Sequence, residues 1–217
     1  MRILQISDLH GNFAAAERAS GKAGEIGVDL ILVVGDITHF GDAGIAGKIL
    51  GKISESGVPI LFVSGNCDSP SLLRWQPKGI DAENIHGRIV EMDGVRFFGV
   101  GGSVGRFGTP TELTEEEIER ILKLFSGSGE DLVLVTHTPP HGLEVDFTGS
   151  KHIGSKAIRR FVEDVQPFLV SCGHVHEGRA VSRLGRSVIV NAGPARNGYC
   201  AVIDIGDEVR VTLSTLY

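Results

Sequence analysis

Histidine and aspartate residues occur in this chain as closely spaced pairs. The segment CGHVHEG carries His174 and His176 two positions apart, and the segment SDLHGN carries Asp8 and His10 at the same spacing. In an extended segment, side chains two positions apart point to the same face. Because imidazole and carboxylate groups are common metal ligands, each pair predicts a shared metal ion. One such pair alone is also compatible with unrelated side chains at an exposed strand end.

The elements that must position these pairs are short apolar runs that alternate with helix-like segments. Five runs end in a metal-ligand type: ILQIS, LILVVG, ILFVSG, LVLVT and FLVSC precede Asp8, Asp36, Asn66, His137 and His174. In an open α/β sheet, side chains beyond the carboxyl ends of parallel strands converge in one crevice. Polar residues commonly follow buried strands, but that habit poorly explains a set made only of Asp, Asn and His. The sequence therefore predicts one metal site built from distant segments.

The alternation also predicts the fold class, which is α/β with a largely parallel sheet covered on both faces. We expect helices from about Phe13, with Asn12 as the N-cap, after Thr114, and over about 155–165, and a hairpin at Asp93-Gly94. Thr114 and Glu117 match a capping box, which places Ile118, Ile121, Leu122 and Phe125 on one apolar stripe of that helix. The last runs, RSVIVN, YCAVIDI and VRVTLST, predict antiparallel hairpins added to the sheet.

Length and composition limit the class of protein. A chain of 217 residues suits one domain, 1–217. The formal net charge of −6, without a run of Lys or Arg, argues against a nucleic-acid groove. Three cysteines without framework spacing suit a reducing compartment, and MRILQIS is too short for a signal peptide or a membrane span. We therefore expect a cytoplasmic protein that binds no membrane; its oligomeric state stays open.

The ordered motifs resemble those of the calcineurin-like metallophosphoesterases over nearly the whole chain, and most closely the small bacterial and archaeal phosphoesterases. The match comprises D-x-H at Asp8 and His10, GD at Asp36, GN at Asn66, a lone histidine at His137, and GHxH at His174 and His176. The resemblance implies a four-layer αββα sandwich with mixed sheets and the metal site at the carboxyl ends of the strands. It also implies two ions: Asp8, His10 and His176 hold one, Asn66, His137 and His174 hold the other, and Asp36 bridges them.

Such a centre suits phosphate-ester hydrolysis. Two divalent ions roughly 3.5–4 Å apart neutralise the phosphate and clamp the attacking and leaving oxygens, while metal-bound water has its pKa lowered to about 7. Oxygen and nitrogen ligands suit Mn²⁺, Fe²⁺, Zn²⁺, Co²⁺ or Ni²⁺ without choosing among them. We expect metal-bound hydroxide to hydrolyse small phosphodiesters, cyclic nucleotides among them. A phosphomonoesterase with the same site, or a non-catalytic metal-binding scaffold, is the alternative.

The chain departs from the family pattern at two positions. Many members carry a histidine after the GN asparagine and an aspartate three residues after the GD aspartate, where this chain has Cys67 and His39. A thiol is a poor proton donor to an alkoxide, so His39 is the predicted acid, unless it is only a loop histidine. Asp68 is expected to brace its loop. We predict His39, Asn66 and His137 as catalytic residues, and Asn12, His141, His152 and Arg196 as substrate contacts. For the substrate contacts, a solvated loop or surface charge is the alternative.

Overall fold

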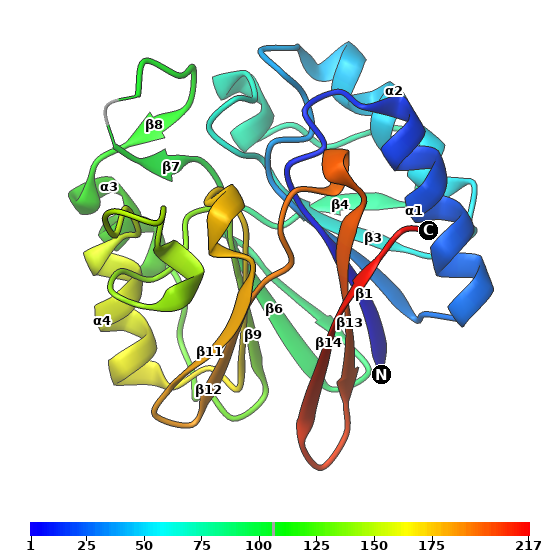
Figure 1. Ribbon diagram of the computed structural model, residues 1–217. Coiled ribbons are helices and arrows are strands. Elements are labelled where there is room, and N and C mark those ends of the chain that lie inside the picture. Colours follow the sequence, from blue (N-terminus) through cyan, green and yellow to red (C-terminus); the bar gives the residue numbers. More distant parts are fainter. Residues whose placement is uncertain (106) are drawn as a thin grey trace.

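The computed structural model describes residues 1–105 and 107–217. Two six-stranded sheets pack face to face, and helices cover their outer faces (Figure 1). The first sheet has the order β14-β13-β1-β2-β3-β4, with β1 (Arg2–Ile6), β2 (Leu30–Val34), β3 (Ile60–Val63), β4 (Ala82–Asn84), β13 (Tyr199–Ile205) and β14 (Val209–Thr215). Strands β1 to β4 are parallel, whereas β13 pairs antiparallel with β1 and with β14. Helices α1 (Phe13–Ile26) and α2 (Ala43–Ser54) cover its outer face.

The second sheet has the order β11-β12-β10-β9-β6-β5. Its strands are β5 (Ile89–Met92), β6 (Val95–Val100), β9 (Leu132–Thr136), β10 (Leu169–Cys172), β11 (Ala180–Leu184) and β12 (Ser187–Asn191). The four central strands are parallel, and β5 and β11 form antiparallel edges. Helices α3 (Glu115–Leu122) and α4 (Lys156–Val165) cover its outer face. A short parallel pair, β7 (Ser103–Val104) and β8 (Glu112–Leu113), stands beside it.

Three apolar layers separate the four structural layers. Alternating side chains of one strand supply two of them: Ile3 of β1 packs between the sheets, whereas Leu4 packs under α1 and α2. The third layer joins the second sheet to α3 and α4, with Ile118 and Ile158 as buried members. This two-residue alternation is expected of a strand covered on both faces. The four-layer αββα prediction is confirmed.

Most predicted elements are present. The Asn12 side chain caps α1 by accepting the Ala15 N–H at 3.0 Å, and the capping box of Thr114 and Glu117 opens α3. The predicted hairpin at Asp93-Gly94 joins β5 to β6. Among the described residues, no helix is long and apolar enough to cross a bilayer.

Two details of the prediction are wrong. The run RSVIVN contains β12, which does form an antiparallel hairpin, with the unexpected edge strand β11, but β12 itself continues the parallel part of the sheet beside β10. Helix α3 ends at Leu122, so Phe125 is buried from the turn beyond it and not from the helical stripe. The apolar pattern located both buried segments, but a pattern of burial fixes neither the partner strand nor the helix end.

Candidate metal centre

The seven predicted metal-binding side chains meet at the carboxyl ends of the parallel strands, at the top of the molecule in Figure 1. They are Asp8, His10, Asp36, Asn66, His137, His174 and His176, and all are buried or half-buried. Backbone hydrogen bonds tie the first two loops together, because His10 N–H donates to the Asp36 carbonyl at 2.8 Å. The sheet ends therefore deliver these residues to one place, as the sequence predicted.

The local conformation of the pairs differs from the extended one that the sequence suggested. Strand β1 ends at Ile6 and β10 ends at Cys172, before either pair begins. Asp8 (φ 56°), His10 (φ 47°) and His174 (φ 67°) all adopt left-handed backbone conformations. Residues other than glycine rarely adopt left-handed backbone conformations, and those that do concentrate at functional sites. Tight turns beyond the strands, and not strand alternation, bring the paired side chains together.

One cluster contains Asp8, His10 and His176. The Nε2 atom of His176 lies 3.2 Å from Asp8 Oδ1 and 3.3 Å from His10 Nε2. His10 Nε2 in turn lies 3.6 Å from Asp36 Oδ2. Three nitrogen and oxygen atoms that face one another at these distances can surround a single cation.

The second cluster is built around His137. Its Nε2 atom lies 3.0 Å from Asn66 Oδ1 and 3.5 Å from Asp36 Oδ1, and its ring centroid lies 5.1 Å from that of His174. Asp36 therefore presents one carboxylate oxygen to a histidine of each cluster. This placement is what a carboxylate between two cations requires.

The hydrogen-bonding pattern of the site fits a divalent cation. His137 Nδ1 lies 2.9 Å from the Val34 carbonyl, so it carries the donating N–H and leaves the Nε2 lone pair facing Asn66 Oδ1. Two acceptors at this distance repel unless a cation or a proton lies between them. The buried atoms His10 Nδ1 and His174 Nε2 also have no hydrogen-bond partner in the described part of the chain.

The pKa values show how strongly the pocket attracts positive charge. Burial lowers the pKa of His137, but the Asp36 carboxylate outweighs burial and raises it to about 9. Burial raises the pKa of Asp36, but His137, His10 and the Cys67 backbone N–H at 2.7 Å hold it well below its ordinary value. Burial, with His137 nearby, lowers the pKa of His174 to about 4 and keeps that imidazole neutral. In the metal-free chain a proton thus takes the place of a cation.

Comparison with known proteins identifies the family. Residues 1–178 match the calcineurin-like phosphoesterases. The chain belongs to this family. This phosphoesterase is 35% identical over 202 residues to the uncharacterized protein MJ1162 of Methanocaldococcus jannaschii, which covers 89% of this chain and 88% of that protein. Members of the family use a dinuclear metal centre, and the chain is a hydrolase that acts on phosphate esters.

Solved structures share the fold at low sequence identity. A dimetal phosphatase from Danio rerio matches with a TM-score of 0.71 and 13% identity, over 100% of this phosphoesterase and 96% of that chain. A protein described as a novel archaeal phosphodiesterase matches with a TM-score of 0.56 and 16% identity, over 99% of this chain and 100% of that chain. These matches confirm the architecture of the phosphoesterase fold.

Two motif glycines are required by contact with the centre. A Cβ atom at Gly65 would lie 2.1 Å from Asp36 Oδ1, and one at Gly35 would lie 2.2 Å from His137 Nδ1. The glycines of the GN and GD motifs therefore leave room for the carboxylate and the imidazole of this phosphoesterase. Asp68 braces the same loops, because its carboxylate accepts the Gly65 N–H at 2.8 Å and the Thr38 N–H at 2.7 Å.

His39 and Cys67 lie beside the first cluster, at the positions that depart from the family pattern. Their ligand atoms and one nitrogen of His10 lie within 4.8 Å of one another. Burial and the Asp36 carboxylate raise the pKa of the Cys67 thiol well above its ordinary value, so the thiol is a poor acid. The exposed His39 ring stacks on Phe40 with centroids 4.4 Å apart. His39 is thus near the centre and open to solvent, and its role as the acid stays a prediction.

The predicted substrate contacts lie at different places. Arg196 Nη2 is 3.3 Å from His176 Nδ1, which puts its guanidinium beside the centre. The Asn12 side-chain oxygen is engaged as a helix cap. His141 and His152 flank the buried Asp146 carboxylate, with nitrogens at 3.4 and 2.7 Å, and form a separate cluster in the loop after β9. The structure therefore brings Arg196 to the metal-binding side chains, and holds the two loop histidines through Asp146.

Two residues beside the centre were missed by sequence reasoning. Phe40 stacks on His39, and the Phe107 ring centroid lies 5.7 Å from that of His174. Each stands alone in a glycine-containing loop, in THFGD and GRFGT, where a sequence does not show whether a phenylalanine is buried or exposed. Their exposure is visible only in the folded phosphoesterase.

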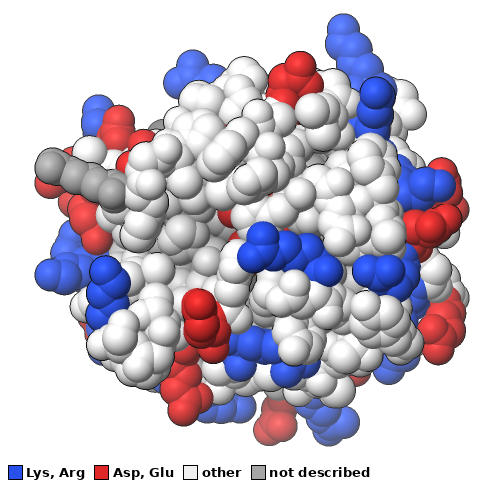
Figure 2. Space-filling view, turned by 45° about the horizontal axis from the view of Figure 1, so that its top comes forward, with Lys and Arg blue, Asp and Glu red and all other residues white. Residues whose placement is uncertain are grey.

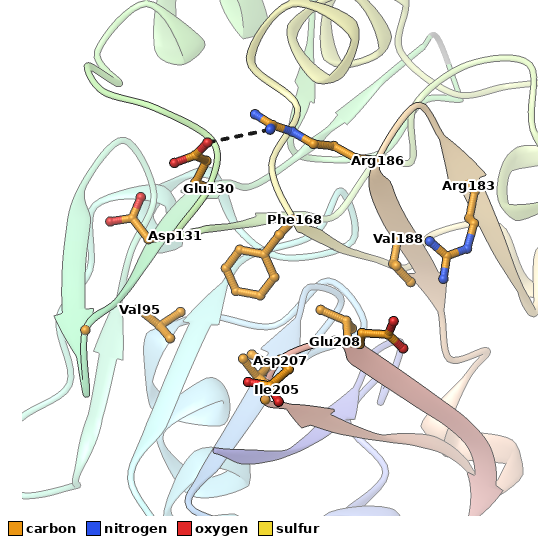
Figure 3. Close-up of a pocket in the computed structure, with 13 residues that line it drawn as sticks. Val95, Glu130, Asp131, Phe168, Arg183, Arg186, Val188, Ile205, Asp207 and Glu208 are labelled. Carbon is orange, nitrogen blue, oxygen red and sulfur yellow. Dashed lines mark ion pairs between the residues drawn. The ribbon is translucent and has the colours of Figure 1, made fainter.

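Another pocket lies at the opposite end of the sheets (Figure 3). It has a volume of about 510 Å³, and Val95, Asp131 and Phe168 line it at the amino ends of β6, β9 and β10. An ion pair of Glu130 with Arg186, 3.7 Å apart, crosses its rim. None of the predicted site residues lines this pocket.

Proposed function

We propose that this phosphoesterase hydrolyses small phosphodiesters, with cyclic nucleotides as candidate substrates. The observation that carries the proposal is the position of Asp36, whose two carboxylate oxygens each face a histidine of a different cluster. In this proposal, Asp8, His10 and His176 hold one ion, Asn66, His137 and His174 hold the other, and Asp36 bridges them. Mn²⁺ is the proposed metal, within the set that oxygen and nitrogen ligands suit.

Each part of the site has a separate task in this proposal. Two divalent ions, when bound, supply the positive charge that a phosphate anion needs and lower the pKa of water. The guanidinium of Arg196, beside His176, is suited to donate hydrogen bonds to a phosphate oxygen. Asn66 and His137 orient the second side of the centre, since the Val34 carbonyl fixes the His137 ring. His39 is the proposed proton donor to the leaving oxygen.

The choice of a diester over a monoester has two supports. A phosphodiester carries two ester groups, and an exposed ring stands beside each cluster: Phe40 stacks on His39, next to the first, and Phe107 lies beside His174 of the second. One solved structure with the same fold is described as an archaeal phosphodiesterase. Another is described as a dimetal phosphatase, which keeps a phosphomonoesterase as the second candidate.

The proposal also includes a single domain over 1–217 and a cytoplasmic location. The single domain is supported by β13 and β14, which lie beyond the matched residues 1–178 and yet extend the first sheet through β1. The cytoplasmic location is supported by three free, buried cysteines, Cys67, Cys172 and Cys200.

Metal analysis and a matched pair of substrates test the function. We expect two divalent metals per chain, activity that a chelator abolishes and that Mn²⁺ or Ni²⁺ restores, and faster turnover of bis-nitrophenyl phosphate than of nitrophenyl phosphate. No bound metal after saturation and dialysis would refute the proposal. Faster turnover of the monoester would replace it with the second candidate.

Two variants test the ligand assignment. Asp36→Asn should lower the occupancy at both sites, because it weakens the group between them, whereas His10→Ala should mainly empty one site. His86→Ala is the control, since His86 is a half-buried histidine outside both clusters. Equal loss of both metals in Asp36→Asn and His10→Ala, with the fold intact by circular dichroism, would contradict the bridging role.

A further inference from the structure

Exposed phenylalanines concentrate at the catalytic end of the molecule. Of the described residues, the phenylalanines with exposed side chains are Phe13, Phe40, Phe107 and Phe147, which are 39–57% exposed. Phe13, Phe40 and Phe147 lie in the chain beyond the carboxyl ends of β1, β2 and β9, and Phe107 lies between β7 and β8. An exposed benzene ring forgoes the free energy of burial, so a group of them around one face indicates a binding surface.

Two of these rings lie next to histidines at the metal centre. The Phe40 ring is nearly parallel to the His39 ring, at an interplanar angle of 23°, and His39 lies 5.6 Å from the His10 ring. The Phe107 ring lies 5.7 Å from the His174 ring. Phe40 therefore lies beside the first cluster, through His39, and Phe107 lies beside His174 of the second cluster.

The backbone under each ring is held in place. The Phe40 N–H donates to the Cys67 carbonyl at 2.8 Å, and the Cys67 N–H donates to the Asp36 carboxylate. The Phe107 N–H donates to the Glu112 carboxylate at 2.7 Å, which also accepts the Thr109 N–H. Rings on anchored backbone lose little further entropy when a ligand stacks on them. They are therefore preorganised for contact.

The surroundings favour a flat, weakly charged group. Figure 2, which brings the top of the molecule forward, shows a broad surface of mainly uncharged residues, interrupted near its middle by a Lys or Arg and by small areas of Asp or Glu. Nucleobases stack on aromatic side chains regardless of base identity, because every base has a π-face. A group that contacts Phe40 lies beside His39, and a group that contacts Phe107 lies beside His174, so either group is next to the metal centre. A group bound by these rings must therefore be attached to, or lie next to, a phosphate at the metal centre.

We propose that Phe40 and Phe107 are substrate-recognition residues that stack flat heteroaromatic groups, so that the natural substrates are phosphoesters of nucleosides. This inference rests on the proposed function, since the metal centre must hold the phosphate. In an open-chain diester, the two organic groups leave the phosphorus through different oxygens and extend in different directions, whereas a cyclic nucleotide offers one base to either ring. One ring is then available to each group.

A pair of ligands that differ only in the base tests the inference. The non-hydrolysable phosphonates of adenosine and of ribose are titrated into the Mn²⁺-loaded protein by calorimetry. We expect the adenosine compound to bind about tenfold more tightly, equivalent to about 1.4 kcal/mol. Equal dissociation constants for the two compounds would overturn the inference. Octyl phosphonate is the third ligand, and binding as tight as that of the adenosine compound would show that apolar bulk, and not a flat base, is recognised.

Substitutions connect the preference to the rings. In the double variant Phe40→Leu with Phe107→Leu, which keeps apolar bulk but removes the flat faces, the two dissociation constants should agree within about twofold. The single variants show which ring contributes. Leu124→Ala, at an exposed apolar side chain just beyond α3, is the control and should keep the full preference. An undiminished preference in the double variant, with the metal content unchanged, would also overturn the inference.

Binding and catalysis can fail separately. If the base preference is present but no diester is hydrolysed, the stacking role stands and the proposed catalytic function is wrong. If diesters are hydrolysed without any base preference, the catalytic function stands and the stacking role is wrong.

Discussion

The substitution Gly65→Ala tests the geometry of the centre without removing any metal-binding side chain. Gly65 does not have a positive φ, so its backbone accepts an alanine. The added Cβ atom, however, would lie 2.1 Å from Asp36 Oδ1 and 2.2 Å from the Asp36 backbone nitrogen. The closest contacts of the added Cβ atom are therefore all with the aspartate between the two clusters.

The size of the effect follows from these distances. An ordinary carbon contact is about 3.5 Å, so the Asp36 carboxylate or the loop of Gly65 must move by about 1.4 Å. Overpacking of this kind costs about 1–3 kcal/mol, which lowers the melting temperature of a chain of this length by about 2–12 °C. A displaced carboxylate also no longer faces His10 and His137 together. We expect both metal sites to lose more than half of their occupancy.

The assay combines elemental analysis after dialysis with thermal unfolding of the metal-free chain. Gly24→Ala is the matched control, because no atom lies within 4 Å of its added Cβ and Gly24 is inside α1. The control should bind metals normally and be stabilised by up to about 1 kcal/mol, through helix propensity. Full metal occupancy together with an unchanged melting temperature in Gly65→Ala would refute the reasoning, since neither the Asp36 carboxylate nor the loop of Gly65 would then have moved.

Two further predictions concern protons. His39→Ala should leave turnover of bis-nitrophenyl phosphate within about tenfold but slow turnover of a nucleoside diester by about 10²–10⁴. The reason is that the nucleoside alkoxide is a poorer leaving group than nitrophenolate and needs a proton. Equal slowing of both substrates would rule out the acid role. In the metal-free chain, folding raises the pKa of His137 from 6.5 to about 9, so its stabilisation is complete below pH 6.5 and is lost as the pH rises through 9. Metal binding must displace this proton, so the affinity of the chain for the metal should rise about tenfold per pH unit between pH 7 and 9. Calorimetry of metal binding in two buffers measures the proton release. No proton release at pH 7.5 would contradict a protonated His137 in the metal-free chain.

Sequence reasoning located the site because of where strands end. Buried apolar runs are easy to recognise, and the residue that follows each run, such as Asp36 or His137, must lie at a sheet end. The same reasoning gave the wrong conformation for Asp8 and His10, because left-handed turns leave no periodic pattern in a sequence. Tertiary contacts set those dihedral angles, here the bonds from the Asp8 and His10 N–H groups to the carbonyls of the β2 loop.

Partner choice in the sheets was beyond local patterns. Edge strand β11 alternates half-buried and exposed residues and contains Ser182 and Arg183, so its signal is weak. The exposure of Phe40 and Phe107 was equally hidden, since a phenylalanine in a loop is as easily buried as exposed. Each of these features depends on contacts between distant segments, which a single sequence does not display.

The candidate ligands come from both sheets, four from loops of the first and three from loops of the second. A cation held among them is therefore a cross-link between two halves of the molecule that otherwise meet through apolar packing and a few hydrogen bonds, such as those from Gln5 to the carbonyls of Cys172 and Val190. At a free metal concentration one hundred times the dissociation constant, one such ion adds about 2.7 kcal/mol to the free energy of unfolding. Metal scarcity in a cell would thus lower the stability of the enzyme as well as its activity. It would shorten the lifetime of the protein, so that the amount of phosphoesterase follows the metal supply.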